Sequence, residues 1–314
     1  MSRQRLAVTL GDPRGIGPEV VADAVRHLEN QGSDTEFILL GPDEFNPGLG
    51  TYNGVGHFDG SERSAGLLSA LAVERAVRLA LVGTVAGIVT GPIHKPALRS
   101  AGFMEPGHTE MLQRLTDVSD VGMLMVAEET ALGAPLRVLL ATTHVPLRDV
   151  PDLLSTDLLV SQAMLLNSSL EIDWNLARPR LALCALNPHA SDDGLFGDEE
   201  NLVFRPAIDA LCKADIQVEG PIPADTVFNR MLNGEYDAVI APYHDVGMAP
   251  FKTIAFGAGV NVTLGLPFVR TSPDHGTAFD IVDTSRADSS SMQAALRMAS
   301  GLASKRFGTL AART

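Results

Sequence analysis

The stretch that decides the fold class is RLAVTLGDPRGIGPEVVADAVRHLEN, residues 5–30. Residues 5–10 are mostly apolar and predict a buried strand. The glycine-rich turn GDPRGIGPE follows, and apolar residues then recur at helical spacing over residues 19–30. A buried strand, a glycine-rich turn and an amphipathic helix in this order are typical of one repeating unit of an α/β fold.

The same alternation of strand and helix continues along the chain. We expect further strands at residues 86–90, 121–127, 136–143, 180–186, 237–241 and 260–264, and further helices at residues 64–82, 153–170, 199–213 and 292–306. Ser155 or Thr156 is available to cap the second of these helices. Residues 42–63, rich in Gly, Asn and Asp, predict a surface excursion. The alternation predicts an α/β fold with a largely parallel sheet.

Length and charge limit the classes of protein to which the chain can belong. Its 314 residues suffice for one large or two medium domains with a sizeable core. The formal net charge of −14 argues against nucleic acid or an anionic membrane as the main partner. An anionic small-molecule substrate would therefore have to meet a local cluster of basic residues.

The start of the chain and its cysteines indicate a cytoplasmic protein. The first residues lead directly into a strand pattern without an apolar signal segment, and no apolar run is long enough to span a membrane. Cys184 lies in an apolar run and Cys212 in a helical pattern, so we expect both to be buried thiols rather than disulfide partners.

Three histidines share one sequence context. His144 ends the run LRVLLATTH, His189 ends RLALCALNPH and His244 ends YDAVIAPYH. Ligands of open parallel sheets bind at the carboxyl ends of the strands, and three imidazoles with an open position suit a catalytic metal ion. No local spacing ties the three together, so three unrelated loop histidines are the alternative interpretation.

Further polar residues lie close to these histidines or at an expected helix start. Asp245 can orient an imidazole, accept a proton or simply cap the following helix. His108 and Thr109, in PGHTEML, lie where a helix begins, and such an end favours an anion, although Thr109 can also be only an N-cap.

A second group of polar residues follows His244. Lys252, Asn261 and Arg270 lie in or near the run GVNVTLGLPFVRTSPDHGTAFD, and Lys and Arg form strong hydrogen bonds to phosphate or carboxylate. Taken singly, each is more often a surface residue; together they predict a binding wall. GDPRGIGPE lacks both the dinucleotide and the P-loop pattern, so by itself it is weak support for a nucleotide.

Taken together, these segments resemble the PdxA family of 4-hydroxythreonine-4-phosphate dehydrogenases in pyridoxal phosphate biosynthesis. The resemblance extends over residues 5–285 and is carried, in order, by TLGDPRGIGPEV, GPIHKPAL, PGHTEML, ATTHVPLRDV, ALNPHASDDGLFGDEE, GPIPADTVF, YHDVGMAPFK and GVNVTLGLPFVRTSPDHGTAFDI. It implies two α/β/α domains around a central cleft, like isocitrate and isopropylmalate dehydrogenases. We expect residues 1–105 plus 270–314 in the first domain and residues 106–269, with most metal and substrate ligands, in the second. The resemblance also implies a homodimer whose subunits share the active site.

The resemblance assigns roles to residues at matching positions. It implies metal binding by His144, His189 and His244, and substrate binding by His108, Thr109, Lys252, Asn261 and Arg270. By analogy with the isocitrate and isopropylmalate dehydrogenases, it implies nucleotide binding by His275, Gly276, Ala278 and Asp280.

The implied reaction is the oxidation of 4-phosphohydroxy-L-threonine with NAD or NADP, followed by loss of CO2 to give 3-amino-2-oxopropyl phosphate. One divalent ion (Zn, Mg or Co) supplies Lewis acidity, and the nicotinamide accepts the hydride. Asp245, Asp225 and Lys95 are the candidate proton acceptors. The phosphate, held by basic residues away from the reacting carbon, supplies binding energy.

The chain departs from the usual family pattern at several positions. Val246 stands where a Gln is usual, and Arg14 stands where a small residue is usual. Asp192 and Asp193 bring carboxylates close to the second histidine loop, and VDTSRAD at residues 282–288 bears on the choice between NAD and NADP.

Two alternatives stay open. The first, which these departures keep open, is a dehydrogenase of a related acid, D-threonate or D-erythronate 4-phosphate. The second, from another class, is a metal-dependent hydrolase or an acyl-phosphate transferase on a similar sheet, which would need no nicotinamide.

Overall fold

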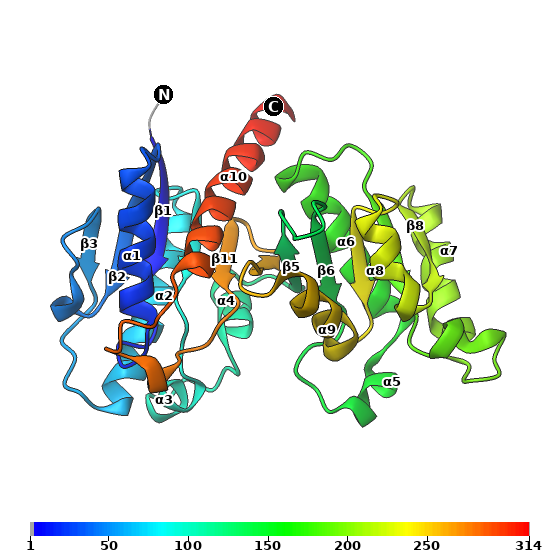
Figure 1. Cartoon of the computed structure of the whole chain (residues 1–314), viewed down its shortest axis with the longest axis horizontal. Helices are drawn as coiled ribbons and strands as arrows, with labels where there is room; N and C mark the ends of the chain where they lie inside the picture. The colour runs from blue at the N-terminus through cyan, green and yellow to red at the C-terminus, as the bar shows by residue number, and fades with distance from the viewer. Residues whose placement is uncertain (1–2, 314) are drawn as a thin grey trace. The chain divides into compact units, whose positions relative to one another are not determined.

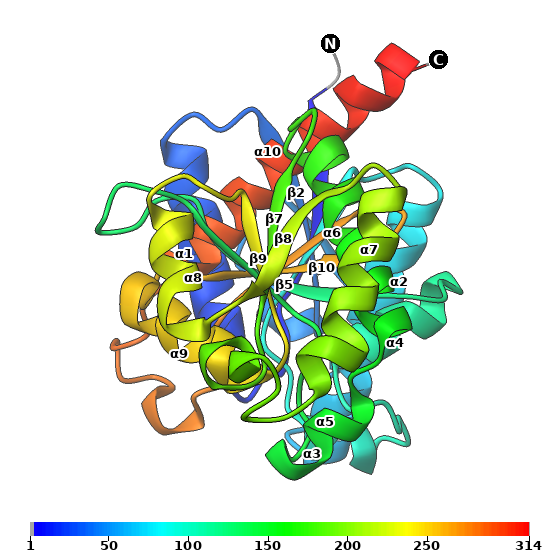
Figure 2. The ribbon, with the colours of Figure 1, turned by 90° about the vertical axis from the view of Figure 1, so that its right-hand side faces the viewer.

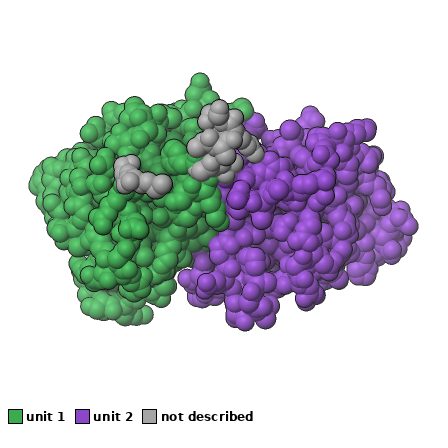
Figure 3. Space-filling model, turned by 90° about the horizontal axis from the view of Figure 1, so that it is seen from above, with its two compact units in different colours: residues 1–119, 260–307 green, residues 120–259, 308–314 purple. Residues whose placement is uncertain are grey.

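The computed structural model describes residues 3–313 and the side chains of residues 3–307. The chain divides into two compact units, which we call unit 1 and unit 2. Unit 1 comprises residues 3–119 and 260–307, and unit 2 comprises Asp120–Gly259 together with residues 308–313 (Figure 3). Each unit contains β-strands with helices on both faces (Figure 1).

The strands of unit 1 follow the spatial order β3, β2, β1, β4, β11 and β10. Their bounds are Thr51–Gly54 (β3), Thr35–Gly41 (β2), Gln4–Thr9 (β1), Gly87–Thr90 (β4), Val269–Pro273 (β11) and Val260–Leu264 (β10). Neighbours in this order pair in parallel, except that β10 and β11 are antiparallel. Residues at the carboxyl ends of the parallel strands therefore lie along one edge of the sheet.

Helices cover both faces of this sheet. Their bounds are Gly17–Asn30 (α1), Glu62–Leu81 (α2), Lys95–Ser100 (α3), His108–Thr116 (α4) and Ser290–Arg313 (α10), with 3-10 turns at Asp43–Phe45 and Phe279–Ile281. α1 and α10 lie on one face and α2 on the other (Figures 1 and 2). The apolar stripe of α1, which includes Val21, Ala24 and Leu28, is buried, as its helical spacing predicts.

The strands of unit 2 follow the order β5, β6, β9, β7 and β8. Their bounds are Gly122–Ala127 (β5), Leu136–Leu140 (β6), Ala238–Ala241 (β9), Arg180–Cys184 (β7) and Gln217–Ile222 (β8). β5 and β6 form an antiparallel hairpin, and the other neighbours are parallel.

The helices of unit 2 also lie on both faces of its strands. Their bounds are Val150–Leu153 (α5), Thr156–Asp173 (α6), Arg205–Lys213 (α7), Ala224–Leu232 (α8) and His244–Ala255 (α9), with short turns at Leu147–Asp149, Pro188–Asp192 and Glu200–Phe204. α6 and α7 cover one face, and α8 and α9 the other (Figure 2). Phe228 of α8 and Phe251 of α9 pack with Val239 of β9 in a buried core.

The chain passes between the units after residues 119 and 259, whereas the sequence led us to expect residues 105 and 269. Two contacts account for the difference. α4 packs against α2, and β10 pairs with β11, so both α4 and β10 belong to unit 1.

The structure confirms some of the local predictions and corrects others. The α/β class is confirmed, and Ser155 caps α6 by accepting a hydrogen bond from the Leu158 backbone N–H at 3.1 Å. The excursion at residues 42–63 contains the edge strand β3, which its polar composition concealed. Cys184 is buried, but the expectation for Cys212 is wrong.

Cys212 is exposed because it lies outside the buried face of α7, which consists of Ala207 and Leu211. Both cysteines are free thiols. Among residues 3–313, no helix combines the length and the apolar character needed to cross a membrane.

Candidate active site

Three histidines follow three neighbouring strands of unit 2. β6, β9 and β7 are parallel neighbours in that order. His144 follows β6, His244 follows β9 as the first residue of α9, and His189 follows β7. Because the carboxyl ends of parallel neighbours share an edge, the topology gathers the three histidine loops along one edge of the sheet.

The rings of His144 and His244 lie beside each other. Their centroids are 5.6 Å apart, and the ring planes are inclined at 42°. Both residues line a pocket of about 130 Å³, together with Thr143, Tyr243 and Asp245. An ion about 2.1 Å from one nitrogen of each ring would hold the two centroids at a similar separation, so this pair fits a shared metal ion.

Asp245 orients the imidazole of His244. His244 Nδ1 lies 2.8 Å from Asp245 Oδ1. The carboxylate can only accept this hydrogen bond, so Nδ1 carries the proton and Nε2 keeps its lone pair for a ligand. The alternative in which Asp245 merely caps α9 finds no support, because the N-cap is Tyr243 and no side chain caps this end.

His189 lies in an unusual turn after β7. Five consecutive residues, His189–Asp193, have φ between 47° and 67°, in the left-handed region. This conformation is costly for residues other than glycine and persists only where the surroundings hold it. Among the residues that the structure describes, no group of three or more His, Cys, Asp or Glu could hold a metal ion. The structure thus pairs His144 with His244 and leaves His189 on the neighbouring strand end.

Glu200 anchors the chain just before His189. Its buried carboxylate accepts hydrogen bonds from the backbone N–H groups of Leu186 and Asn187, at 2.9 and 2.7 Å. It also accepts one from Asn187 Nδ2 at 2.9 Å. Sequence reasoning missed Glu200, because a glutamate in a helical run gives no sign that it is buried. Its bonds fix the backbone two residues before a proposed metal ligand.

The candidate proton acceptors lie in both units. Asp245 and Asp225 share unit 2 with the histidines, and Asp225 is exposed in the first turn of α8. Burial, and then the charge of Asp225, raise the pKa of the Cys184 thiol, at the end of β7, to about 12. Lys95 begins α3 in unit 1.

Arg270 is a buried cation on β11 of unit 1. Its Nη1 donates to Thr263 Oγ1 at 2.8 Å and its Nη2 to Thr90 Oγ1 at 2.7 Å, while its buried Nε has no partner. Only 2% of the residue is exposed, and burial lowers its pKa to about 10. Within the described part of the chain, no carboxylate pairs with this guanidinium. A buried charge contacted only by hydroxyl groups favours an anionic ligand.

Two further polar side chains are linked to Arg270. Asn261 is opposite Ser272 in the β10–β11 ladder, and Ser272 is two residues from Arg270, so Asn261, Ser272 and Arg270 share a face of the sheet. Burial, and then the charge of Arg270, lower the pKa of His108 well below its usual value. His108 Nε2 and Asn261 Oδ1, like Arg270 Nε, are buried without a partner among the described residues.

The other expected substrate contacts lie at helix positions. Thr109 is the second residue of α4 and does not cap it, because the N-cap is Gly107. Lys252 lies in α9 of unit 2, where its Nζ is 5.8 Å from the centroid of the Phe256 ring. Val246, two residues after His244 in sequence, packs against the apolar core of unit 2.

The residues expected to bind the nucleotide lie in one loop of unit 1. His275 Nδ1 is 3.0 Å from the carbonyl oxygen of Gly276, and His275 Nε2 is buried without a partner among the described residues. Ala278 adopts a left-handed conformation with φ 43°, and the exposed Asp280 lies in the 3-10 turn that follows.

A larger pocket lies elsewhere in unit 2. It has a volume of about 380 Å³ and is lined by Arg180 and Gln217, the first residues of β7 and β8, and by Cys212 and Tyr236. These are the amino ends of the strands, away from the edge where the histidines lie. Pocket size alone therefore does not select a site, and the histidine edge is the candidate active site because it lies at the carboxyl ends of the strands.

The chain has a two-unit α/β fold, with potential metal and substrate ligands at the carboxyl ends of its strands. This architecture defines the class of fold to which the chain belongs. The structure is similar to that of isocitrate dehydrogenase from Methylococcus capsulatus, with a TM-score of 0.52 and 14% identity over 94% of this chain and 84% of that one, a likeness of fold alone. The chain belongs to the PdxA family, because residues 47–299 match the family profile described as "Pyridoxal phosphate biosynthetic protein PdxA".

Individual relatives match over nearly the whole chain. A 4-hydroxythreonine-4-phosphate dehydrogenase from Paracoccus denitrificans is 40% identical over 96% of this chain and 98% of its own. A D-threonate 4-phosphate dehydrogenase from Pectobacterium atrosepticum is 36% identical over 95% of this chain and 99% of its own. The crystal structure of 4-hydroxythreonine-4-phosphate dehydrogenase from Klebsiella pneumoniae has a TM-score of 0.84 and 36% identity, covering 96% of this chain and 99% of that one.

Proposed function

We propose that the protein oxidises 4-phosphohydroxy-L-threonine with NAD or NADP in a metal-dependent reaction that continues to 3-amino-2-oxopropyl phosphate and CO2. Membership of the PdxA family supports this proposal, as does the similarity to a 4-hydroxythreonine-4-phosphate dehydrogenase over nearly the full length of both chains. The reaction would contribute to the biosynthesis of pyridoxal 5'-phosphate.

The burial of Arg270 is the strongest structural support for this proposal. Among the described residues, its guanidinium bonds only to the hydroxyls of Thr90 and Thr263. It shares a sheet face with Asn261 and its charge acts on His108, and both of these residues have a buried polar atom without a partner in the described part of the chain. A phosphate would accept hydrogen bonds from Arg270 Nε and from a protonated His108 Nε2, and would compensate the buried charge. Thr109 and Lys252 are the further proposed contacts.

We propose that His144 and His244, whose rings lie beside each other, hold one divalent ion (Zn, Mg or Co), and that His189 reaches this ion from the neighbouring strand end only when the ion is bound. When bound, the ion would supply Lewis acidity at the substrate hydroxyl. Asp245 fixes the tautomer of His244, so that Nε2 is the ligating atom.

The proton of the substrate hydroxyl needs an acceptor from the protein. The Asp245 carboxylate already accepts the hydrogen bond of His244. Asp225 is then the remaining candidate carboxylate in the unit that carries the histidines, and Lys95 is the candidate in unit 1. For the nucleotide we propose His275, Gly276, Ala278 and Asp280, and for the assembly a homodimer with a shared active site.

A second candidate substrate is D-threonate 4-phosphate. The relative from Pectobacterium atrosepticum, a D-threonate 4-phosphate dehydrogenase, is nearly as similar to this chain as the Paracoccus enzyme, at 36% against 40% identity. The two acids share the phosphate and differ at the substituent beside the reacting carbon. Specificity would therefore depend on residues near the metal, such as Val246, Asp192 and Asp193.

An alternative from another class is an acyl-phosphate transferase. A branched-chain phosphotransacylase from Enterococcus faecalis shares the fold with a TM-score of 0.63, but only 14% of its residues are identical, so this likeness concerns the fold alone. A transferase would not need a nicotinamide. Stabilisation against heat unfolding by NAD or NADP therefore separates the two classes.

A substrate panel tests the proposal. Reduced nicotinamide is measured with NAD and with NADP, using 4-phosphohydroxy-L-threonine, D-threonate 4-phosphate and D-erythronate 4-phosphate, with unphosphorylated 4-hydroxy-L-threonine as the control. We expect the highest kcat/KM with the first compound, and a loss of about 100-fold or more without the phosphate, whose binding energy orients the substrate. Absence of nucleotide reduction with every phosphorylated acid would contradict the proposal.

A further inference from the structure

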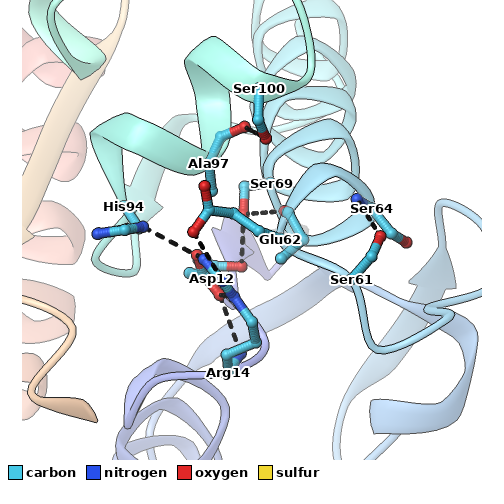
Figure 4. Close-up of polar contacts among 11 residues, drawn as sticks. Asp12, Arg14, Ser61, Glu62, Ser64, Ser69, His94, Ala97 and Ser100 are labelled. Carbon is cyan, nitrogen blue, oxygen red and sulfur yellow. Dashed lines mark hydrogen bonds and ion pairs between the residues drawn. The ribbon is translucent and has the colours of Figure 1, made fainter.

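Arg14 lies at the centre of a polar cluster in unit 1 (Figure 4). Its Nε and Nη2 donate to the two carboxylate oxygens of Asp12 at 3.0 and 2.8 Å, and its Nη1 donates to Glu62 at 3.3 Å. Nη2 also lies 3.2 Å from His94 Nδ1. A guanidinium has no acceptor atom, so Nδ1 of His94 can only accept in this contact.

The cluster is not an open site for an anion. Asp12 is fully buried and receives two hydrogen bonds from the guanidinium of Arg14, and these hydrogen bonds raise the pKa of Arg14. A guanidinium has about five N–H donors, and four contacts within unit 1 already engage it. One cation faces two carboxylates, from Asp12 and Glu62, so a further anion gains little here. The function of Arg14 must then lie in what it holds in place.

Arg14 contacts the ring of Phe279, in the proposed nucleotide loop. The guanidinium carbon lies 5.4 Å from the centroid of this ring. His94 meets the same ring edge-on, with centroids 5.0 Å apart and an interplanar angle of 80°. Cation–π and edge-to-face contacts of this kind each contribute about 0.5–1.5 kcal/mol. Two side chains therefore fix the orientation of a ring that is still 41% exposed.

The backbone of the same loop is attached directly beside Arg14. Ile16 N–H donates to the carbonyl oxygen of Thr277 at 2.9 Å. Gly15 makes this approach possible, because a Cβ at this position would lie 2.6 Å from that oxygen. The loop is thus held at Thr277 by the backbone and at Phe279 by side chains, on either side of the left-handed Ala278.

From these contacts we propose that Arg14 is a positioning residue, which holds residues 277–281 in the conformation that receives the nucleotide and presents the exposed ring of Phe279 to its base. This inference rests on the proposed function, because it takes the loop to bind NAD or NADP. A flat heteroaromatic base stacks well on an exposed aromatic ring. A binding loop that is already ordered loses less conformational freedom on binding, so its affinity is higher.

The test compares the intact protein with the variants Arg14→Ala, Arg14→Lys and Phe279→Leu. Arg26→Ala is the matched control, since it removes an exposed ion pair, with Asp23, from the same unit. The nucleotide Kd is measured by titration calorimetry, and amide hydrogen exchange is measured for residues 275–285. We expect Arg14→Ala and Phe279→Leu to raise the Kd about tenfold, Arg14→Lys to recover part of this loss, and the control to leave the Kd unchanged.

The kinetic constants and the exchange rates separate positioning from mere stability. We expect Arg14→Ala to raise the KM for the nucleotide while kcat and the KM for the phosphorylated acid change by less than about twofold. Faster exchange in residues 275–285 should accompany this change. Unchanged Kd and exchange in Arg14→Ala would overturn the inference, as would an equal loss of affinity in Arg26→Ala. If the wild-type protein binds neither nucleotide, it is the proposed function that fails, and faster loop exchange in Arg14→Ala would still show that Arg14 positions the loop.

Discussion

His244 and Asp245 are consecutive residues whose side chains are joined, with His244 Nδ1 2.8 Å from Asp245 Oδ1. The ring of His244 also lies beside that of His144, with the centroids 5.6 Å apart. The hydrogen bond fixes the tautomer of one proposed metal ligand, and the ring contact places a second beside it. Sequence position alone supports neither statement, since it gives only three histidines after three apolar runs.

Loss of the Asp245 carboxylate should weaken metal binding. We expect Asp245→Asn to lower the affinity for a divalent ion by about 10-fold, because hydrogen bonds to ligating histidines typically contribute 10- to 100-fold. Metal titration of the chelator-treated protein measures this change. Asp152→Asn, at an exposed position in unit 2, is the control and should bind the ion as the wild type does. Equal affinities in all three proteins would rule out the orienting role of Asp245.

Removal of any one of the three histidines should reduce the metal content. We expect His144→Ala, His189→Ala and His244→Ala each to retain less than about a tenth of the wild-type metal after dialysis, because a catalytic site has only three protein ligands. Elemental analysis of the purified proteins provides the measurement. His27→Ala, on the exposed side of α1, should keep the full metal content. A His189→Ala protein with unchanged metal would remove His189 from the proposed site.

Replacement of Arg270 should weaken binding of the substrate phosphate rather than slow the chemical step. We expect Arg270→Lys to raise the KM for the phosphorylated acid by about 10- to 100-fold, because lysine cannot reproduce the forked donors of arginine. Inorganic phosphate should raise the Tm of the wild type and not that of this variant. Arg297→Lys, exposed on α10, is the control. Equal stabilisation of Arg270→Lys by phosphate would show that the anion binds elsewhere.

His108, whose Nε2 is buried, should make stability depend on pH. Its pKa in the folded protein is well below 6.5, because it is buried and lies close to Arg270. As the pH falls through about 6.5, the unfolded chain binds a proton here that the folded chain does not, so the free energy of unfolding falls until the folded pKa is reached.

Chemical denaturation between about pH 7.5 and pH 5 measures this effect. Replacement by glutamine removes the titration, so the wild type should lose up to about 1.4 kcal/mol more per pH unit than His108→Gln in this range. Parallel curves for the wild type and His108→Gln would contradict the burial of a neutral imidazole.

Glu200 should contribute to both stability and metal binding. We expect Glu200→Gln to lower the free energy of unfolding by about 1–3 kcal/mol, because charged acceptors of backbone N–H groups are replaced by a neutral amide. The affinity for the metal should also fall, since Glu200 holds Leu186 and Asn187 just before His189. Glu199→Gln is the control: its carboxylate bonds to Asn187 Nδ2, and we expect a smaller effect. Unchanged metal affinity in a folded Glu200→Gln protein would limit its role to stability.

The sequence predicted the fold better than it predicted the site. Helical spacing located α1 and α2, and apolar runs located β1, β4 and β9, because burial on one or both faces leaves a periodic pattern. β3 was not predicted, because an edge strand in a Gly- and Asn-rich segment lacks that pattern. The unit boundaries depend on which elements pack together, and the local sequence does not encode this.

For the site, the sequence could supply candidate residues but not the burial or the contacts of their side chains. The position of Arg270 in the run LPFVRTSP does not reveal that its charge is buried without a carboxylate. The same limit applies to Glu200, which looks like a surface residue of a helix, and to Arg14, whose partner Phe279 is distant in sequence. Only the fold shows which groups are buried and which are adjacent.

The most direct test of the central claim is to count both products of one reaction. The chelator-treated protein is assayed with 4-phosphohydroxy-L-threonine and the preferred nucleotide, before and after a divalent ion is restored, and reduced nicotinamide and CO2 are measured together. A metal-dependent oxidation followed by decarboxylation predicts no products without the ion and equal amounts of both with it. Metal-loaded protein that reduces neither NAD nor NADP, or that reaches full rate without any ion, would contradict it.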